Sequence, residues 1–211
     1  LDSLKQILST GSPLVTESFN YVYEHVKKDV LLGSISGGTD IISCFALNNP
    51  TLPVYKGELQ CRGLGMDVDV FDNNGKSIRN KKGELVCRSP FPSMPISFWN
   101  DKSGEKYHNA YFNKFKDTWA HGDFIEVNDH GGVIIYGRSD ATLNPGGVRI
   151  GTSELYRVVE SFLEVDDSLV IAQEWENDQR IILFLKLREP HIFSEELADT
   201  IKKTIRTSLS P

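Results

Sequence analysis

The sequence predicts a mixed fold: a partial α/β subdomain, a small β-barrel-like subdomain, a hinge and a small α+β C-terminal domain. Three observations support this prediction. Near the N-terminus a strand pattern, an amphipathic helix and a second apolar strand follow one another, as in α/β units. The middle of the chain alternates apolar and polar residues with period two. Towards the C-terminus two helical patterns flank two strand patterns.

The first expected elements end in glycine-containing loops. We expect a strand over residues 4–8, a turn over residues 9–13 and a buried strand over residues 30–35. Between the strands, a helix beginning at Thr16 carries an apolar face formed by Phe19, Val22, Tyr23 and Val26. The second strand leads into a glycine loop over residues 36–40. Loops at the carboxyl ends of such strands are where α/β proteins bind ligands.

The middle of the chain is expected to be mostly β-structure. Residues 66–71 alternate with period two, and residues 83–87 form a second strand pattern. Residues 124–127 and 133–136 flank a glycine-containing loop, which is typical of a hairpin.

The C-terminal part reads as a compact α+β unit. Ser153 can cap a helix with an apolar stripe, and Ser194 can cap a final amphipathic helix. Strands are expected over residues 168–173 and 180–187. The resulting domain boundaries are 1–51 for the α/β subdomain, 52–138 for the β-rich subdomain, 139–141 for the hinge and 142–211 for the C-terminal domain.

Composition and charge restrict the classes of partner. The chain has 211 residues, of which 39% are hydrophobic and 25% charged, as in ordinary globular proteins. Its net charge of −6 has no basic block to offset it, so we expect no nucleic-acid partner. No apolar stretch is long enough to span a bilayer, and no signal peptide opens the chain. No obligate protein partner is evident.

The cysteines point to a reducing compartment. Cys44, Cys61 and Cys87 are an odd number and lack C-x-x-C spacing. This pattern is typical of cytosolic thiols and suggests neither a disulfide framework nor a zinc site. We therefore expect a cytoplasmic protein.

Two of the loops have the chemistry of a nucleotide site. In residues 36–40, a hydroxyl beside a carboxylate follows two glycines, which suits a phosphate oxygen and a hydrated Mg²⁺. A plain turn is the alternative, and it is also the reading that residues 11–13 favour by themselves. Asp123 follows a glycine and can accept hydrogen bonds from vicinal hydroxyls such as those of a ribose. The neighbouring His121 suggests either acid–base chemistry or a structural role.

The run 136–154 combines glycines with two arginines. Glycines let backbone N–H groups approach a ligand, and the guanidinium groups of Arg138 and Arg149 can bind phosphate or carboxylate. Solvated surface arginines are the alternative. The sequence shows no catalytic triad, metal cluster or paired carboxylates, which fits chemistry that depends on positioning and charge stabilisation.

The run 136–154 resembles the hinge motif of the adenylate-forming acyl-CoA synthetases. Residues 35–41, 53–58, 98–101 and 119–123 match the same family in the same order, so that the resemblance covers essentially the whole chain. The residues in these segments are most similar to those of the family branch that activates acetoacetate. The resemblance implies an ATP-dependent ligase that forms an acyl-adenylate and pyrophosphate, after which the thiol of coenzyme A displaces AMP.

The resemblance also assigns roles to individual residues. In the first half-reaction Thr39 would meet the α-phosphate and Asp40 would stand near Mg²⁺, while Asp123 would hold the ribose with Arg138 nearby. The other nucleotide-binding positions would be Gly11, Ser12 and Pro13 at the adenine pocket, together with Gly37 and Gly38.

The remaining roles fall at the hinge and beyond it. Arg149 would neutralise the phosphate charge that develops as the carboxylate attacks, which makes Thr39, Asp40 and Arg149 the catalytic candidates. Asp140 matches the residue about which the C-terminal domain swings. Gly147 would line the coenzyme A tunnel, and Arg206 would approach the coenzyme A phosphates.

Some positions depart from the family pattern. His121 replaces a common threonine, and Ala141 replaces an acidic residue beside the hinge. Acetate-activating relatives place a tryptophan where this chain has Gly37, so we expect open space there for acetoacetate. The phosphate-binding loop and the C-terminal lysine of the family are absent from the chain, and its first residue is not Met. We therefore expect a fragment that cannot complete adenylation alone.

Two other functions remain open on this reasoning. The chain could belong to a ligase for another short carboxylate, such as propionate or a hydroxybutyrate. It could also be a non-catalytic nucleotide-binding module, because two expected catalytic parts are missing.

Overall fold

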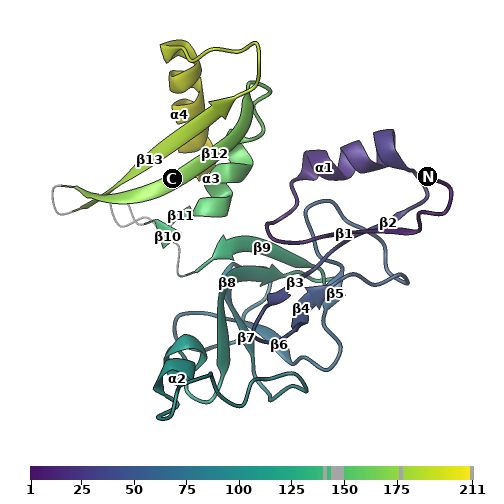
Figure 1. The fold of residues 1–211 in the computed structure, drawn as a ribbon, viewed down its shortest axis with the longest axis vertical. Coiled ribbons are helices and arrows are strands. Elements are labelled where there is room, and N and C mark those ends of the chain that lie inside the picture. The colour runs from purple at the N-terminus through teal and green to yellow at the C-terminus, as the bar shows by residue number, and fades with distance from the viewer. Residues whose placement is uncertain (140–141, 144–149, 176–177, 210–211) are drawn as a thin grey trace. The chain divides into compact units, whose positions relative to one another are not determined.

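The structure, a computed structural model, describes residues 1–139, 142–143, 150–175 and 178–209. The chain divides into two compact units, Leu1–Tyr136 and Gly137–Pro211 (Figure 1). The boundaries expected inside each unit remain predictions. In the part of the chain that the structure describes, no helix is both long and apolar enough to cross a membrane.

The first unit begins with the expected strand–helix–strand order. Strand β1 (Gln6–Ser9) pairs in parallel with β2 (Leu31–Ser34), and α1 (Thr16–Tyr21) with the π-helical turn η1 (Val22–Val26) lies between them in the chain. Phe19 on α1 is only 1% exposed, as its apolar stripe predicts. The prediction of an α/β unit is confirmed here.

The glycine segment after β2 differs from the prediction. Ser36–Gly38 forms a strand, β3, which pairs antiparallel with β4 (Ser43–Leu47), and β4 pairs with β5 (Cys61–Arg62). The expected loop over residues 36–40 is therefore wrong in its first three residues, and the turn occupies residues 39–42. The glycines allow β3 to approach β4 closely, and the register shifts between Ser36 and Gly37.

The middle of the chain forms an open sheet. Its strands are β6 (Val68–Phe71), β7 (Gly83–Cys87), β8 (Trp119–Val127) and β9 (Val133–Arg138), hydrogen-bonded in that order. All four strands were expected, although β8 begins earlier than predicted. The described strands do not close into a barrel, so the barrel-like part of the prediction is wrong.

The core of the first unit lies between this sheet and the β3–β5 hairpin strands. Phe45, Val70, Leu85 and Ile125 are fully buried in it, and Trp119 is 1% exposed. A short helix that the sequence did not predict, α2 (Glu105–Tyr111), precedes β8 and packs aromatic side chains against the same core.

The described residues of the second unit form two antiparallel strand pairs and two helices. Its elements are β10 (Thr142–Leu143), β11 (Ile150–Gly151), α3 (Thr152–Val159), β12 (Val165–Trp175), β13 (Asp178–Leu187) and α4 (Glu195–Leu209). Strands β12 and β13 pair antiparallel, and Leu155, Val159 and Ile201 are buried. Both predicted helices and both predicted strands are confirmed.

Of the two predicted N-caps of these helices, one is wrong and one is confirmed. The predicted cap at Ser153 is wrong, because Gly151 is the N-cap and its N–H donates to the Glu154 carboxylate at 2.8 Å. The predicted cap at Ser194 is confirmed: its hydroxyl accepts the N–H of Leu197 at 3.1 Å.

Candidate functional site

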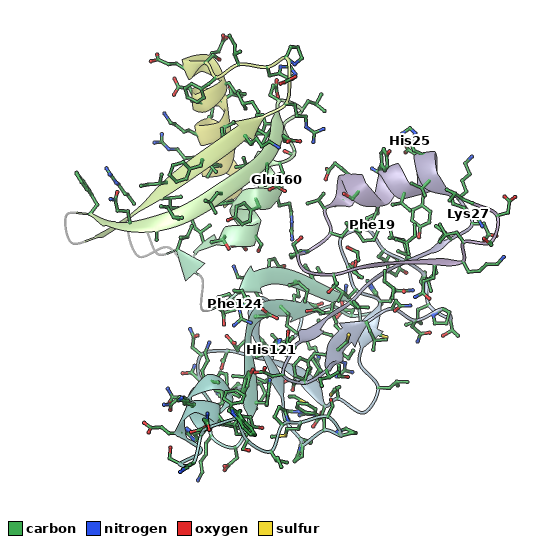
Figure 2. The ribbon with its side chains drawn as sticks, viewed as in Figure 1. Phe19, His25, Lys27, His121, Phe124 and Glu160 are labelled. Carbon is green, nitrogen blue, oxygen red and sulfur yellow. The ribbon has the colours of Figure 1, made fainter. Side chains whose placement is uncertain are left out.

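Strands β3 and β8 meet at the side chain of His121, which is labelled in Figure 2. The Nε2 atom of His121 lies 3.2 Å from the carbonyl oxygen of Gly37 on β3. The same atom lies 3.7 Å from a carboxylate oxygen of Asp123 on β8. His121 and Asp123 are each 7% exposed. The expected ribose-binding carboxylate therefore lies beside the strand that leads to Thr39.

The surroundings of His121 define its tautomer. The indole Nε1 of Trp119 lies 3.4 Å from Nδ1 of His121, and an indole nitrogen can only donate. Nδ1 therefore accepts, and the ring proton is on Nε2, where it faces the carbonyl of Gly37. The ring also packs edge-on against Phe45 at 4.8 Å between centroids. These contacts favour the structural role for His121 over acid–base chemistry.

Thr39 and Asp40 lie on the exposed turn that joins β3 to β4. The hydroxyl of Tyr111 donates to a carboxylate oxygen of Asp40 at 2.5 Å. The Tyr111 ring stacks on the indole of Trp119, with 3.6 Å between centroids and 13° between planes. The turn is thus anchored to the aromatic core through Asp40.

Asp40 can supply a single ligand to a metal ion. Among the described residues no group of three or more His, Cys, Asp or Glu side chains is placed to hold one. Mg²⁺ in nucleotide sites is usually held by one or two carboxylates together with phosphate oxygens. A single carboxylate at Asp40 is thus compatible with the expected role beside nucleotide-bound Mg²⁺, which stays a prediction.

A buried carboxylate contacts β8 just before Asp123, where the pairing of β7 with β8 is irregular. Glu84 on β7 is 2% exposed. Its carboxylate accepts a hydrogen bond from the N–H of Gly122 at 3.0 Å and forms an ion pair with Lys114 at 2.5 Å. Gly122 has a φ of +83°, a conformation that favours glycine. Glu84 was not among the predicted site residues, although an acidic residue inside an otherwise apolar strand was a signal for it.

Residues 11–13 follow the end of β1, which lies beside the end of β2 from which the chain continues into β3. Ser9 and Ser34 are register partners at the ends of the parallel strands β1 and β2, and the N–H of Ile35 donates to Ser9 at 2.9 Å. Gly11 follows β1 with a φ of +93°, and no atom would crowd a side chain there. The expected adenine loop and the chain that enters β3 thus start from adjacent strand ends.

The space expected at Gly37 is not there. A Cβ atom at this position would collide with the carbonyl oxygen of Ser43 and lie 2.8 Å from the Cα of Cys44. The expectation of open space at Gly37 is therefore wrong, because its hydrogen faces the backbone of β4. Burial raises the pKa of the adjacent Cys44 thiol, so this thiol is a poor nucleophile.

The other predicted positions belong to the second unit or lie outside the described residues. Arg138 is exposed at the end of β9. Arg206 is exposed on α4, where it borders an apolar groove of about 460 Å³ lined by Leu155, Leu183, Phe193 and Ile201. Asp140, Ala141, Gly147 and Arg149 lie outside the described residues.

The chain was compared with known proteins. No family model matches it. It is 56% identical over 211 residues to the acetoacetyl-coenzyme A synthetase of Rhizobium meliloti (strain 1021), and 55% identical over 212 residues to the acetoacetyl-CoA synthetase of Gallus gallus. The chain belongs to the acetoacetyl-CoA synthetase family. Both alignments cover 100% of this chain and 32% of the relative, so the chain spans about a third of the length of these family members.

Solved structures agree with this family assignment. The acetoacetyl-CoA synthetase from Streptomyces lividans matches the whole chain with a TM-score of 0.86 at 42% identity, and 32% of that chain is covered. The anthranilate CoA ligase AuaEII, in complex with anthranoyl-AMP, matches 99% of this chain with a TM-score of 0.78, covering 39% of its own length. At 22% identity this second match supports the fold alone. The resemblance predicted from the sequence motifs is confirmed.

Proposed function

We propose that this chain is part of an ATP-dependent acid–thiol ligase that activates acetoacetate as an acyl-adenylate and transfers it to coenzyme A, releasing AMP. The observation that carries the proposal is the 56% identity to an acetoacetyl-coenzyme A synthetase along the whole chain. The meeting of Asp123 with the β3 strand at His121 supports it, because these segments are expected to bind one nucleotide.

In the first half-reaction the residues of the first unit hold the nucleotide. The exposed hydroxyl of Thr39 donates to the α-phosphate, and Asp40 contributes a carboxylate to the Mg²⁺ that accompanies ATP. Asp123 accepts hydrogen bonds from the ribose hydroxyls. The adenine pocket is bordered by Gly11, Ser12 and Pro13, and the backbones of Gly37 and Gly38 complete the site. Bound Mg²⁺ neutralises phosphate charge as the carboxylate attacks.

The second unit supplies the groups that act around the hinge. Arg138 lies near the ribose, and Arg149 stabilises the charge on the phosphate. Asp140 is the swivel between half-reactions. Gly147 lines the coenzyme A tunnel, and Arg206 approaches the coenzyme A phosphates from α4. The 211-residue chain alone is proposed to be inactive, because it spans only about a third of the length of these relatives.

The partners in this proposal are small molecules: acetoacetate, ATP and coenzyme A. The net charge of −6 supports the absence of a nucleic-acid partner. The free thiols of Cys44, Cys61 and Cys87 support a cytoplasmic location. No membrane or obligate protein partner forms part of the proposal.

A direct test uses the full-length protein that carries this chain. Acetoacetate-dependent exchange of labelled pyrophosphate into ATP reports the first half-reaction, and we expect exchange in the wild type and its loss in Asp123→Ala. Faster exchange with propionate or 3-hydroxybutyrate than with acetoacetate would favour a ligase for another short carboxylate. ATP binding without exchange with any of these acids would favour the non-catalytic module.

A further inference from the structure

The indole of Trp119 is connected to both ends of the segment 37–40, which carries Thr39. One connection runs through His121 to the carbonyl of Gly37, and the other runs through Tyr111 to the carboxylate of Asp40. Trp119 itself is 1% exposed and belongs to the main core cluster. The exposed turn is therefore tied at two points to a rigid group.

The connection through His121 depends on the tautomer. Trp119 donates to Nδ1, which leaves the proton on Nε2 to be donated to Gly37. Gly37 pairs with Cys44 across β3 and β4, and a Cβ on the next residue, Gly38, would lie 2.8 Å from Cε1 of His121. The imidazole thus occupies the space that the missing side chain of Gly38 leaves open, and it holds β3 against β8.

The connection through Tyr111 depends on stacking. The ring lies nearly parallel to the indole at 3.6 Å, which places its hydroxyl at Asp40. Tyr111 is the last residue of α2, and Phe98 and Tyr107 pack edge-on against the same ring. The hydroxyl position is therefore set by aromatic packing on several sides.

We propose that His121 and Tyr111 are positioning residues that hold the two ends of segment 37–40 against Trp119 and thereby set Thr39 and Asp40 for adenylation. The inference rests on the proposed function for the roles of Thr39 and Asp40. The clamp, meaning the contacts of His121 with Gly37 and of Tyr111 with Asp40, rests on the structure alone. A misplacement of a positioned group by about 1 Å is enough to lower a rate by roughly a hundredfold.

The His121 end is tested by two substitutions of similar polarity. His121→Gln keeps an amide N–H near the position of Nε2, so it can still donate to Gly37. His121→Asn keeps an acceptor near Nδ1 for Trp119 but is too short to reach Gly37. In pyrophosphate exchange by the full-length protein, we expect His121→Asn to lower kcat by about tenfold or more and His121→Gln to retain most of the rate.

The Tyr111 end is tested by Tyr111→Phe, which keeps the ring stack and removes the hydroxyl. We expect the Mg²⁺ concentration for half-maximal exchange to rise, with little change in the thermal midpoint of unfolding. Equal rates for wild type, His121→Asn and Tyr111→Phe would overturn the proposal. So would equal losses in His121→Asn and His121→Gln that follow their thermal midpoints, since these would indicate a packing role alone.

A measurement without ligand separates the clamp from the proposed function. Backbone hydrogen exchange can be measured by mass spectrometry on peptides of the full-length protein that contain residues 36–45. Exchange in these peptides should be faster in His121→Asn than in wild type, and it should have the wild-type rate in His121→Gln. If the wild type catalyses no pyrophosphate exchange, the proposed function fails, and this measurement still decides the clamp. Unchanged hydrogen exchange in His121→Asn would refute it.

Discussion

Gly37 and Ser43 face each other across the β3–β4 hairpin so closely that a Cβ atom on Gly37 would collide with the carbonyl oxygen of Ser43. Neither backbone can give way easily, because β4 is also paired with β5 and carries the fully buried Phe45. The requirement for glycine at this position is therefore steric and arises from the fold.

Gly37→Ala should destabilise the protein by roughly 1–3 kcal/mol, the usual cost of forcing extra volume into a packed region. Gly38→Ala is the matched comparison and should cost less, because the three atoms nearest to a Cβ there all belong to side chains, the closest being Cε1 of His121 at 2.8 Å, whereas a Cβ on Gly37 meets backbone atoms. Denaturant unfolding of both variants makes the comparison. Gly37→Ala with wild-type stability, or with the smaller loss of the two, would contradict the steric argument.

Gly37→Trp should lower activity towards acetate and acetoacetate together. The sequence alone predicts a shift of preference towards acetate, but the structure leaves no room for the first carbon of the indole side chain. The ratio of kcat/KM for the two acids, measured with the full-length protein, distinguishes these outcomes. A folded Gly37→Trp variant with an acetate preference would show that β4 moves to admit the indole.

Lys114→Met should reduce stability by roughly 1–3 kcal/mol, because it removes the cation beside the buried carboxylate of Glu84. Glu84→Gln should also destabilise the protein, and the double variant should lose less than the sum of the two. Lys116→Met, at an exposed position in the same segment, is expected to have little effect. Additive losses would mean that Lys114 and Glu84 are not coupled.

Asp67 should contribute stability that disappears in acid. Hydrogen bonds from the Arg88 guanidinium and the Ser89 hydroxyl hold the pKa of its carboxyl below the ordinary value. A carboxyl whose pKa is lower in the folded state stabilises the protein above the unfolded pKa, about 3.9, and this contribution is lost as pH falls through the folded pKa.

Thermal midpoints measured from neutral pH down through this range test the linkage. Asp67→Asn should flatten the decrease below about pH 4, whereas the exposed control Asp29→Asn should follow the wild type. Parallel curves for Asp67→Asn and wild type would remove Asp67 as a source of acid sensitivity.

Elements with a clear local period could be predicted from the sequence. The apolar face that includes Phe19 and the alternation that produces β6 depend on neighbouring residues only, and both elements are confirmed. Strand β3 could not be predicted, because its glycines have low strand propensity and it forms through pairing with β4. Helix α2 has only seven residues, and its core-facing Tyr107 and Tyr111 form too short a pattern to reveal a helical period.

The candidate site was only partly predictable for a related reason. The types of residue at Thr39, Asp40 and Asp123 suggested a nucleotide site, whereas their arrangement depends on contacts between distant parts of the chain. His121 and Gly37 are separated by 84 positions in the sequence, and Tyr111 and Asp40 by 71. Neither hydrogen bond leaves a local pattern. The buried ion pair of Lys114 with Glu84 is hidden from the sequence in the same way.

If Asp123 and the segment 37–40 form one nucleotide site, the affinity of the full-length protein for AMP should depend on both. Calorimetric titration should show that Asp123→Ala weakens AMP binding by roughly tenfold to a hundredfold, as expected for the loss of charge-assisted hydrogen bonds to a ribose. Thr39→Val should weaken it as well, through the loss of its contact with the phosphate. Wild-type affinity for AMP in both folded variants would show that Asp123 and Thr39 do not form a common nucleotide site.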